Sequence, residues 1–140
     1  MADIYRSMAK NTDAPLPKLA PVLLAIAVLL VFGRSITADF VSYDDGSLVY
    51  DNEQVTAGIS ASSVRWALTA TGELNLWHPL TYLSHLLDCS LFGIENPGGH
   101  HATSVVLHLA ASIALLLVFH QLTGRPWLAL GLALLWAVHP

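Results

Sequence analysis

Charged residues are scarce in this sequence, and their scarcity limits the class of protein. Asp, Glu, Lys and Arg account for 11% of the 140 residues, well below the roughly 25% of an ordinary soluble domain. Hydrophobic residues account for 54%. This composition argues against a soluble globular domain and indicates an integral membrane protein.

Basic residues and cysteines are few as well. Six Lys and Arg residues stand against ten Asp and Glu residues, which gives a net charge of −4. The sequence has no basic patch that could meet phosphates, so a nucleic-acid partner is excluded. Cys89 is the single cysteine, which excludes an internal disulfide framework.

Apolar residues are abundant, and they gather in three segments. The first, residues 17–38, has 15 uncharged residues between Lys18 and Arg34. A span usually needs about 20 residues, but both basic side chains can extend to the membrane interfaces. A signal peptide is the alternative interpretation. Because Ile36-Thr37-Ala38 is a poor cleavage site, we expect an uncleaved transmembrane helix.

The other two apolar segments follow a long polar stretch. Residues 103–122 are long enough to cross a membrane, and residues 123–126 form a turn that contains Gly and Pro. Residues 127–140 begin a third crossing that is still apolar at its end. We therefore expect the chain to be the N-terminal fragment of a longer polytopic protein.

The charges around these segments predict the orientation of the chain. Basic residues lie in the N-terminal tail (residues 1–16), at Lys18 and at Arg125, and the positive-inside rule places these parts in the cytoplasm. The loop of residues 39–102 is acidic and is expected on the outer side. We expect a bacterial inner membrane, with the endoplasmic reticulum membrane as the alternative. The acidic residues of the loop are Asp39, Asp44, Asp45, Asp51, Glu53, Glu73, Asp88 and Glu95.

Two helices are predicted within this loop. The first spans Ala61–Thr69, and Ser60 is suited to cap it. The second begins at Pro79, because proline favours the first helical position, and ends before Gly93. The loop is therefore expected to be structured rather than a flexible spacer.

The second loop helix is amphipathic. Its apolar side predicts that it lies in the membrane interface, with Trp77 and Tyr82 helping to anchor it. Packing on transmembrane helices is the alternative. The apolar side holds Leu80, Leu83, Leu87 and Leu91, and the polar side holds Thr81, Ser84, His85 and Asp88.

An ordered set of short motifs extends over most of the chain. They are Phe40-Val41-Ser42-Tyr43-Asp44-Asp45, Asn52–Gly58, Trp77–Asp88, Leu91-Phe92-Gly93, Gly99-His100-His101, Leu107-His108, Leu122-Thr123-Gly124 and His139-Pro140. In this order they resemble the N-terminal part of the transmembrane and tetratricopeptide-repeat O-mannosyltransferase-like proteins. That family belongs to the GT-C superfamily of polyprenyl-phosphate-sugar-dependent glycosyltransferases. The resemblance covers about residues 17–140.

The resemblance implies a fold and a reaction. The fold is an all-α membrane protein, a partial GT-C fold with short juxtamembrane helices in a large first extracytoplasmic loop. The reaction moves a sugar, expected to be mannose, from a polyprenyl-phosphate donor to a Ser or Thr hydroxyl of a protein. The implied partners are membrane lipid, the lipid-linked sugar and the protein acceptor. Further helices and tetratricopeptide repeats would complete the protein, so the fragment alone is expected to be inactive.

The resemblance also implies a site in the outer loop. Asp44 is the expected general base, and Asp45 is expected to orient it or to help hold a divalent cation. A solvated turn is the alternative interpretation of this acidic pair. Arg65, the one basic residue of the loop, is a weak candidate for contacting the leaving phosphate. The further substrate-binding candidates are Trp77, His78, His85, Asp88, His100 and His101.

Two other functions are compatible with the sequence. One is a non-catalytic membrane scaffold or pseudoenzyme of the same fold. The other is a metal- or haem-binding membrane protein, because the chain has seven histidines. The sequence contains no HxxxH or HExxH motif and no pair of cysteines, so capping and packing are the preferred roles for these histidines.

Overall fold

The computed structural model describes residues 14–71 and 77–139, and the regular elements within these ranges are all helical. The all-α fold class is thus confirmed. Most of the predicted tail of residues 1–16 lies outside the described residues, as does Glu73. In chain order the elements are α2 (Leu19–Phe32), the 3₁₀-helix η1 (Gly33–Thr37), the π-helix η2 (Gly46–Tyr50), α3 (Glu53–Thr56), α4 (Ala61–Thr69), α5 (Pro79–Phe92), α6 (Pro97–Thr123) and α7 (Pro126–Ala137).

The chain forms two compact units. The first, which we call the helical-hairpin unit, combines the residues up to Arg34 with those from Val105 onward. The second, which we call the loop unit, is residues 35–104. Helix α6 contributes residues to both.

Two helical stretches are long and apolar enough to cross a membrane, Leu19–Thr37 and Pro97–Thr123. In each, only 17% of the most apolar window is buried within the protein. A helix in the core of a soluble protein would be mostly buried, whereas a helix that is apolar all round and exposed suits a lipid environment. Burial therefore agrees with the composition in indicating membrane helices.

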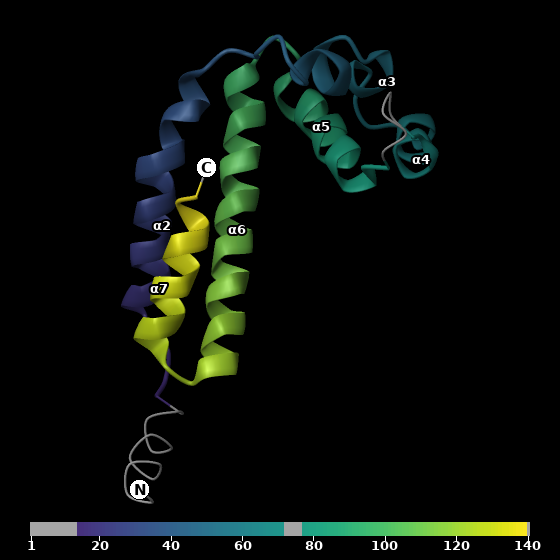
Figure 1. Cartoon of the computed structure of the whole chain (residues 1–140). Helices are drawn as coiled ribbons and strands as arrows, with labels where there is room; N and C mark the ends of the chain where they lie inside the picture. The colour runs from purple at the N-terminus through teal and green to yellow at the C-terminus, as the bar shows by residue number, and fades with distance from the viewer. Residues whose placement is uncertain (1–13, 72–76, 140) are drawn as a thin grey trace, which may run out of the picture. The chain divides into compact units, whose positions relative to one another are not determined.

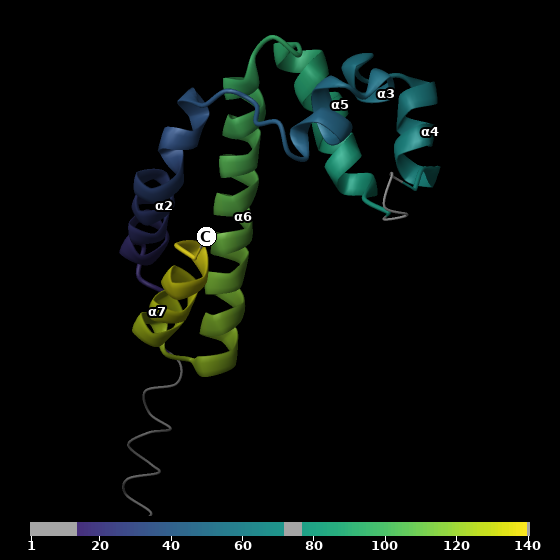
Figure 2. The same ribbon diagram turned by 45° about the horizontal axis from the view of Figure 1, so that its top comes forward.

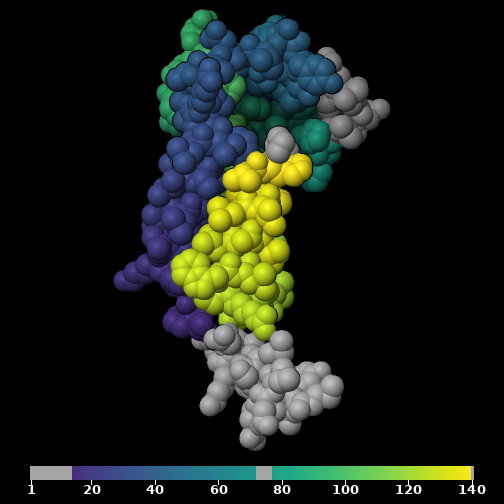
Figure 3. All heavy atoms as spheres, turned by 60° about the vertical axis from the view of Figure 1, so that its left-hand side comes forward, coloured from purple at the N-terminus to yellow at the C-terminus, as the bar shows by residue number. Residues whose placement is uncertain are grey.

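Within the helical-hairpin unit, α2 packs against α7, as Figures 1 and 3 show. The sharp turn between α6 and α7 uses Gly124, whose φ of 60° favours glycine, and Pro126 is the first residue of α7 as predicted. The core of the helical-hairpin unit consists mainly of small and branched side chains, which let helix backbones approach closely. These are Ala20, Leu24, Val28, Val105, Leu116, Ala129, Leu130, Ala133 and Ala137.

His108 has a packing role in this unit. Its Nε2 lies 2.8 Å from the carbonyl oxygen of Ala137, and its ring meets the edge of Phe32 and stacks on Trp136. A histidine satisfied by backbone and aromatic neighbours needs no ligand. The preferred packing role is therefore confirmed for His108.

The loop unit brings η2, α3, α4 and α5 together (Figure 2). Helix α4 has the predicted bounds, and Ser60 caps it by accepting a hydrogen bond from the Ser63 N–H. Helix α5 starts at Pro79 and ends at Phe92, just before Gly93, whose φ is 73°. The buried core consists of Val49, Val55, Ala67, Tyr82 and Leu86.

Helix α5 packs on the core of the loop unit through the side that carries Tyr82 and Leu86. Tyr82, expected as an interfacial anchor, is 3% exposed and packs on Trp66 with ring centroids 4.6 Å apart. Leu86 is fully buried beside it, whereas Leu80 is 79% exposed. The Trp66–Tyr82 pair and Leu86 pack together in this unit. The described residues therefore leave most of the leucine side of α5 exposed.

Helix α6 begins six residues earlier than the predicted apolar segment, at Pro97 rather than at residue 103. Asn96 starts it, because its Oδ1 accepts a hydrogen bond from the Gly99 N–H at 3.1 Å and a proline follows it. His100 and His101 therefore lie in the first turns of α6, within the loop unit. Hydrophobicity alone missed this start, because the first turn is polar.

Candidate functional site

The predicted acidic pair, Asp44 and Asp45, immediately precedes η2. Asp44 is exposed, and its carboxylate forms no hydrogen bond or ion pair with the described part of the chain. Asp45 is half-buried, and its Oδ2 accepts a hydrogen bond from the Val41 N–H at 2.8 Å. The two carboxylates thus differ: one is open to an incoming group, and the other is tied to the backbone.

Helix α5 supplies the next two residues. His85 and Asp88 are three residues apart, so they share one side of the helix. That side faces the core of the loop unit, and Asp88 is only 2% exposed. A buried carboxylate is costly unless it is paired or hydrogen-bonded, so its partners define the site.

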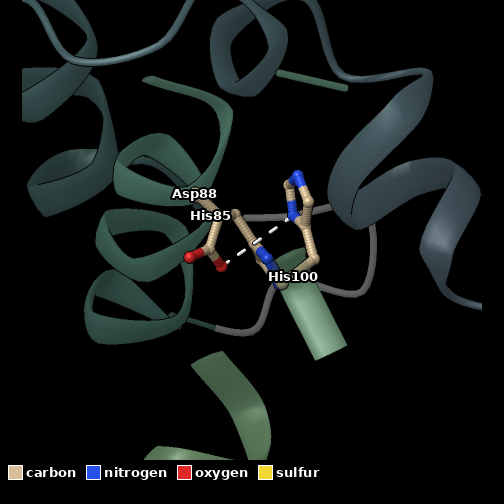
Figure 4. A group of neighbouring side chains, drawn as sticks. All are labelled: His85, Asp88 and His100. Carbon is tan, nitrogen blue, oxygen red and sulfur yellow. Dashed lines mark ion pairs between the residues drawn. The ribbon is translucent and has the colours of Figure 1, made fainter. Parts of the chain in front are cut away.

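The first turns of α6 supply these partners. Thr103 donates a hydrogen bond from Oγ1 to Asp88 Oδ1 at 2.6 Å. His100, which is 3% exposed, places Nδ1 3.8 Å from Asp88 Oδ2 (Figure 4). Its other ring nitrogen, Nε2, lies 3.3 Å from the carbonyl oxygen of Gly93. Both neighbours of the Asp88 carboxylate, Thr103 and His100, therefore come from α6.

A glycine permits this close approach. A Cβ atom at Gly99 would collide with the Phe92 side chain, which packs over the first turn of α6. The glycine and the short connection after Gly93 bring the end of α5 next to the start of α6. Residues from the two helices can then share one cluster.

The protonation of His85 follows from its surroundings. Burial lowers its pKa from the ordinary value of 6.5, and the charge of nearby His100 lowers it further. The carboxylates of Asp88 and Asp45 act in the opposite direction but do not outweigh burial. His85 is therefore neutral near pH 7 and can act as a base or a ligand.

Burial, and next the Asp88 carboxylate, raise the pKa of the Cys89 thiol, which disfavours its reactive thiolate.

The lowered pKa of His85 predicts that the loop unit loses stability in acid. Between 6.5 and the lower folded pKa, the unfolded chain binds a proton that the folded chain does not, so stability falls as the pH falls. With chelator present, thermal unfolding at about pH 7.5 and about pH 5.5 measures this loss. His85→Gln should reduce the difference in melting temperature. An identical pH dependence in the variant would contradict the assignment.

The structure brings together only part of the predicted site. His85, Asp88 and His100 form one cluster, and Asp45 is near enough for its charge to act on His85. His101 contacts the same region through Phe40, with ring centroids 6.1 Å apart. The Phe40 ring also meets the edge of His100 at 5.3 Å.

Two predicted residues lie elsewhere. Trp77 donates from its indole N–H to the carbonyl of Leu68, at the end of α4. His78 is exposed and precedes the first residue of α5. Ten residues of helix separate it from Asp88, about 15 Å at the helical rise. The Trp77–Asp88 motif therefore places His78 and Asp88 near opposite ends of α5.

The sequence did not indicate that Thr103 and Phe40 contact the residues of the candidate site. Thr103 was assigned to the start of an apolar membrane segment, and its hydroxyl gave no signal at that position. Phe40 was one residue of a motif, with no indication of its partners. Both contacts depend on chain segments that meet only after folding.

The chain is 33% identical over 135 residues to the mouse (Mus musculus) protein O-mannosyl-transferase TMTC1, and 29% identical over 143 residues to the mouse protein O-mannosyl-transferase TMTC4. The human (Homo sapiens) TMTC4 is 27% identical. Each match covers 89% of the chain but only 14% to 19% of the relative's length. No family profile and no solved structure matches.

Proposed function

We propose that the chain is the N-terminal membrane part of a glycosyltransferase that transfers mannose from a polyprenyl phosphate to a protein Ser or Thr hydroxyl. The observation that carries the proposal is the similarity to protein O-mannosyl-transferases over 89% of the chain. The apolar helices agree with a donor held in lipid. The GT-C class, the donor and the acceptor are part of the proposal.

The proposed reaction needs one base and one leaving group. The acceptor oxygen attacks the anomeric carbon of mannose, and the bond from that carbon to the phosphate oxygen breaks. The polyprenyl phosphate leaves with the bonding electrons. The proton of the acceptor hydroxyl passes to a carboxylate acting as general base.

The different settings of the two aspartates support a division of roles. Asp44 is exposed and its carboxylate makes no hydrogen bond or ion pair with the described residues, so the carboxylate is available to an acceptor hydroxyl. The carboxylate of Asp45 accepts a hydrogen bond from the Val41 N–H, which ties it to the backbone before η2. We assign Asp44 as the base and Asp45 as a positioning residue.

The proposal includes an orientation in the membrane. The loop unit carries the acidic pair, and the positive-inside rule puts it on the outer side of a bacterial inner membrane or in the lumen of the endoplasmic reticulum. On either of these sides the acidic pair would meet acceptors that have left the cytosol. A cysteine placed at Asp39 in a Cys89→Ser background should react with an impermeant thiol reagent added from that side. Reaction only from the cytosol would refute the orientation.

The function is tested on membranes that contain the complete gene product. Polyprenyl phosphate carrying radiolabelled mannose is added together with an acceptor peptide rich in Ser and Thr, and label in the peptide is measured. We expect time-dependent transfer that exceeds that of matched membranes lacking the protein. A folded, correctly inserted protein that transfers no sugar would favour the scaffold alternative.

A further inference from the structure

Three side chains that can bind a metal converge in the loop unit. His85 and Asp88 come from α5, and His100 comes from α6 (Figure 4). One potential ligand atom from each residue lies within 4.8 Å of the other two. The cluster therefore has the dimensions of a site for a single ion.

The backbone fixes the tautomer of His100. Its Nε2 lies 3.3 Å from the carbonyl oxygen of Gly93, and a carbonyl oxygen can only accept, so Nε2 carries the hydrogen. In the neutral ring, Nδ1 then presents a lone pair. Nδ1 is buried, has no hydrogen-bond partner among the described residues and points at Asp88.

Two acceptors consequently face each other in a buried place. Both side chains are 3% exposed, and His100 Nδ1 lies 3.8 Å from Asp88 Oδ2. A buried acceptor without a partner, such as His100 Nδ1, is costly, and a cation between it and Asp88 Oδ2 would remove this cost. A proton bridge would form a hydrogen bond of about 2.7–2.9 Å, which is much shorter than the gap.

A metal ion fits the gap better than a proton. Zinc bonds of about 2.0–2.2 Å to an imidazole nitrogen and a carboxylate oxygen, at a tetrahedral angle, place these atoms roughly 3.4 Å apart. A small inward movement of the side chains would reach this separation. The third group, His85, offers a buried Nδ1 that also has no hydrogen-bond partner in the described chain.

We propose that His85, Asp88 and His100 bind a divalent transition-metal ion, with Zn²⁺ as the preferred ion. Two imidazoles and one carboxylate suit zinc and its neighbours, whereas Mg²⁺ and Ca²⁺ favour sites made of oxygen atoms. Three protein ligands leave at least one coordination position for water or an incoming oxygen.

The supporting hydrogen bonds are those expected around a metal site. Thr103 donates to Asp88 Oδ1, which leaves Oδ2 directed at the ion. The Gly93 carbonyl orients the His100 ring so that Nδ1 faces the ion. Such outer contacts fix the orientation and the tautomer of metal ligands.

Metal binding is tested on the full chain, purified in detergent without a polyhistidine tag and stripped with a chelator. Titration with Co²⁺ should give visible d–d absorption that saturates at one equivalent, and Zn²⁺ should displace the cobalt. No sugar or acceptor is present, so this result is independent of transferase activity. A folded chain that binds no stoichiometric metal would overturn the proposal.

Variants locate the site. Asp88→Asn and His85→Gln should each raise the Kd for Zn²⁺ at least about tenfold, and Thr103→Val should raise it about 10- to 100-fold. His78→Ala, which removes an exposed imidazole from the start of α5, is the matched control and should leave the Kd unchanged. Circular dichroism of the chelated variants checks folding, and half-buried His85 is the substitution least disruptive to packing. An unchanged Kd in folded His85→Gln, or an equal loss in His78→Ala, would refute the assignment.

Discussion

Asp44→Asn in the complete protein should lower the rate of mannose transfer by about 10²- to 10⁴-fold, the usual contribution of a general base. The asparagine has nearly the same shape but cannot accept the proton of the acceptor hydroxyl. Asp44 is exposed, and its hydrogen bonds with the described residues are made by its backbone and not by its carboxylate, so the substitution should leave the fold intact. Initial rates with labelled lipid-linked mannose measure the effect, and expression and melting temperature check the fold.

Two further substitutions separate catalysis from charge and from positioning. Asp39→Asn removes the same charge from an exposed position five residues upstream and should transfer at the wild-type rate. Asp45→Asn retains an oxygen that can accept from the Val41 N–H, so it should cost less activity than Asp45→Ala. Wild-type transfer by Asp44→Asn would remove Asp44 from the mechanism.

Leu86→Ala should lower the free energy of unfolding of the loop unit by about 2–5 kcal/mol. Leu86 is fully buried between α5 and the other helices of the core, so truncation loses apolar burial and leaves a cavity. Hydrogen exchange of the α5 and α4 amides reports the opening of this unit without unfolding the membrane helices. Faster exchange at these amides, with no change in α2 and α7, is the expected pattern.

Leu80→Ala is the matched control for this prediction. Leu80 lies on the same helix and loses the same atoms, but it is 79% exposed. The expected change is within about 0.5 kcal/mol, as for surface substitutions in general. If Leu80→Ala accelerated exchange as much as Leu86→Ala, the leucine side would be as tightly packed as the side with Tyr82 and Leu86, against the observed exposure of Leu80.

The loop helices show where local sequence signals suffice. Ser60 and Pro79 act on the first turn of their own helices, and Gly93 acts on the last turn of its helix. These effects depend on neighbours within a few residues, so the bounds of α4 and α5 were predictable. The start of α6 was missed, because Asn96 and Pro97 carry the signal in a turn that is not apolar.

The faces of α5 show where local signals fail. The sequence pattern assigned Tyr82 to the membrane interface, yet Tyr82 and Leu86 form the core of the loop unit. An amphipathic pattern shows that a helix has two sides, but it does not say which partners are available. Trp66, on another helix, decides the outcome by packing on Tyr82.

In the candidate site, too, the sequence indicated some residues, whereas tertiary contacts decided how they are arranged. The amphipathic pattern placed His85 and Asp88 on one side of a helix but did not connect them with His100, and the sequence contains no HxxxH or HExxH motif. Their ligand atoms meet because α5 and α6 are packed end to start, with Gly99 allowing the contact. Thr103, fifteen residues after Asp88, completes the cluster.

The sequence by itself determined the helical class, the apolar segments and the caps, because composition and short-range hydrogen bonding act within a few residues. The tertiary structure alone decided which side of α5 is buried and that two histidines and an aspartate form one cluster. Those outcomes depend on contacts between segments far apart in the chain, and the energy of a buried carboxylate or imidazole is set by the neighbours that folding supplies.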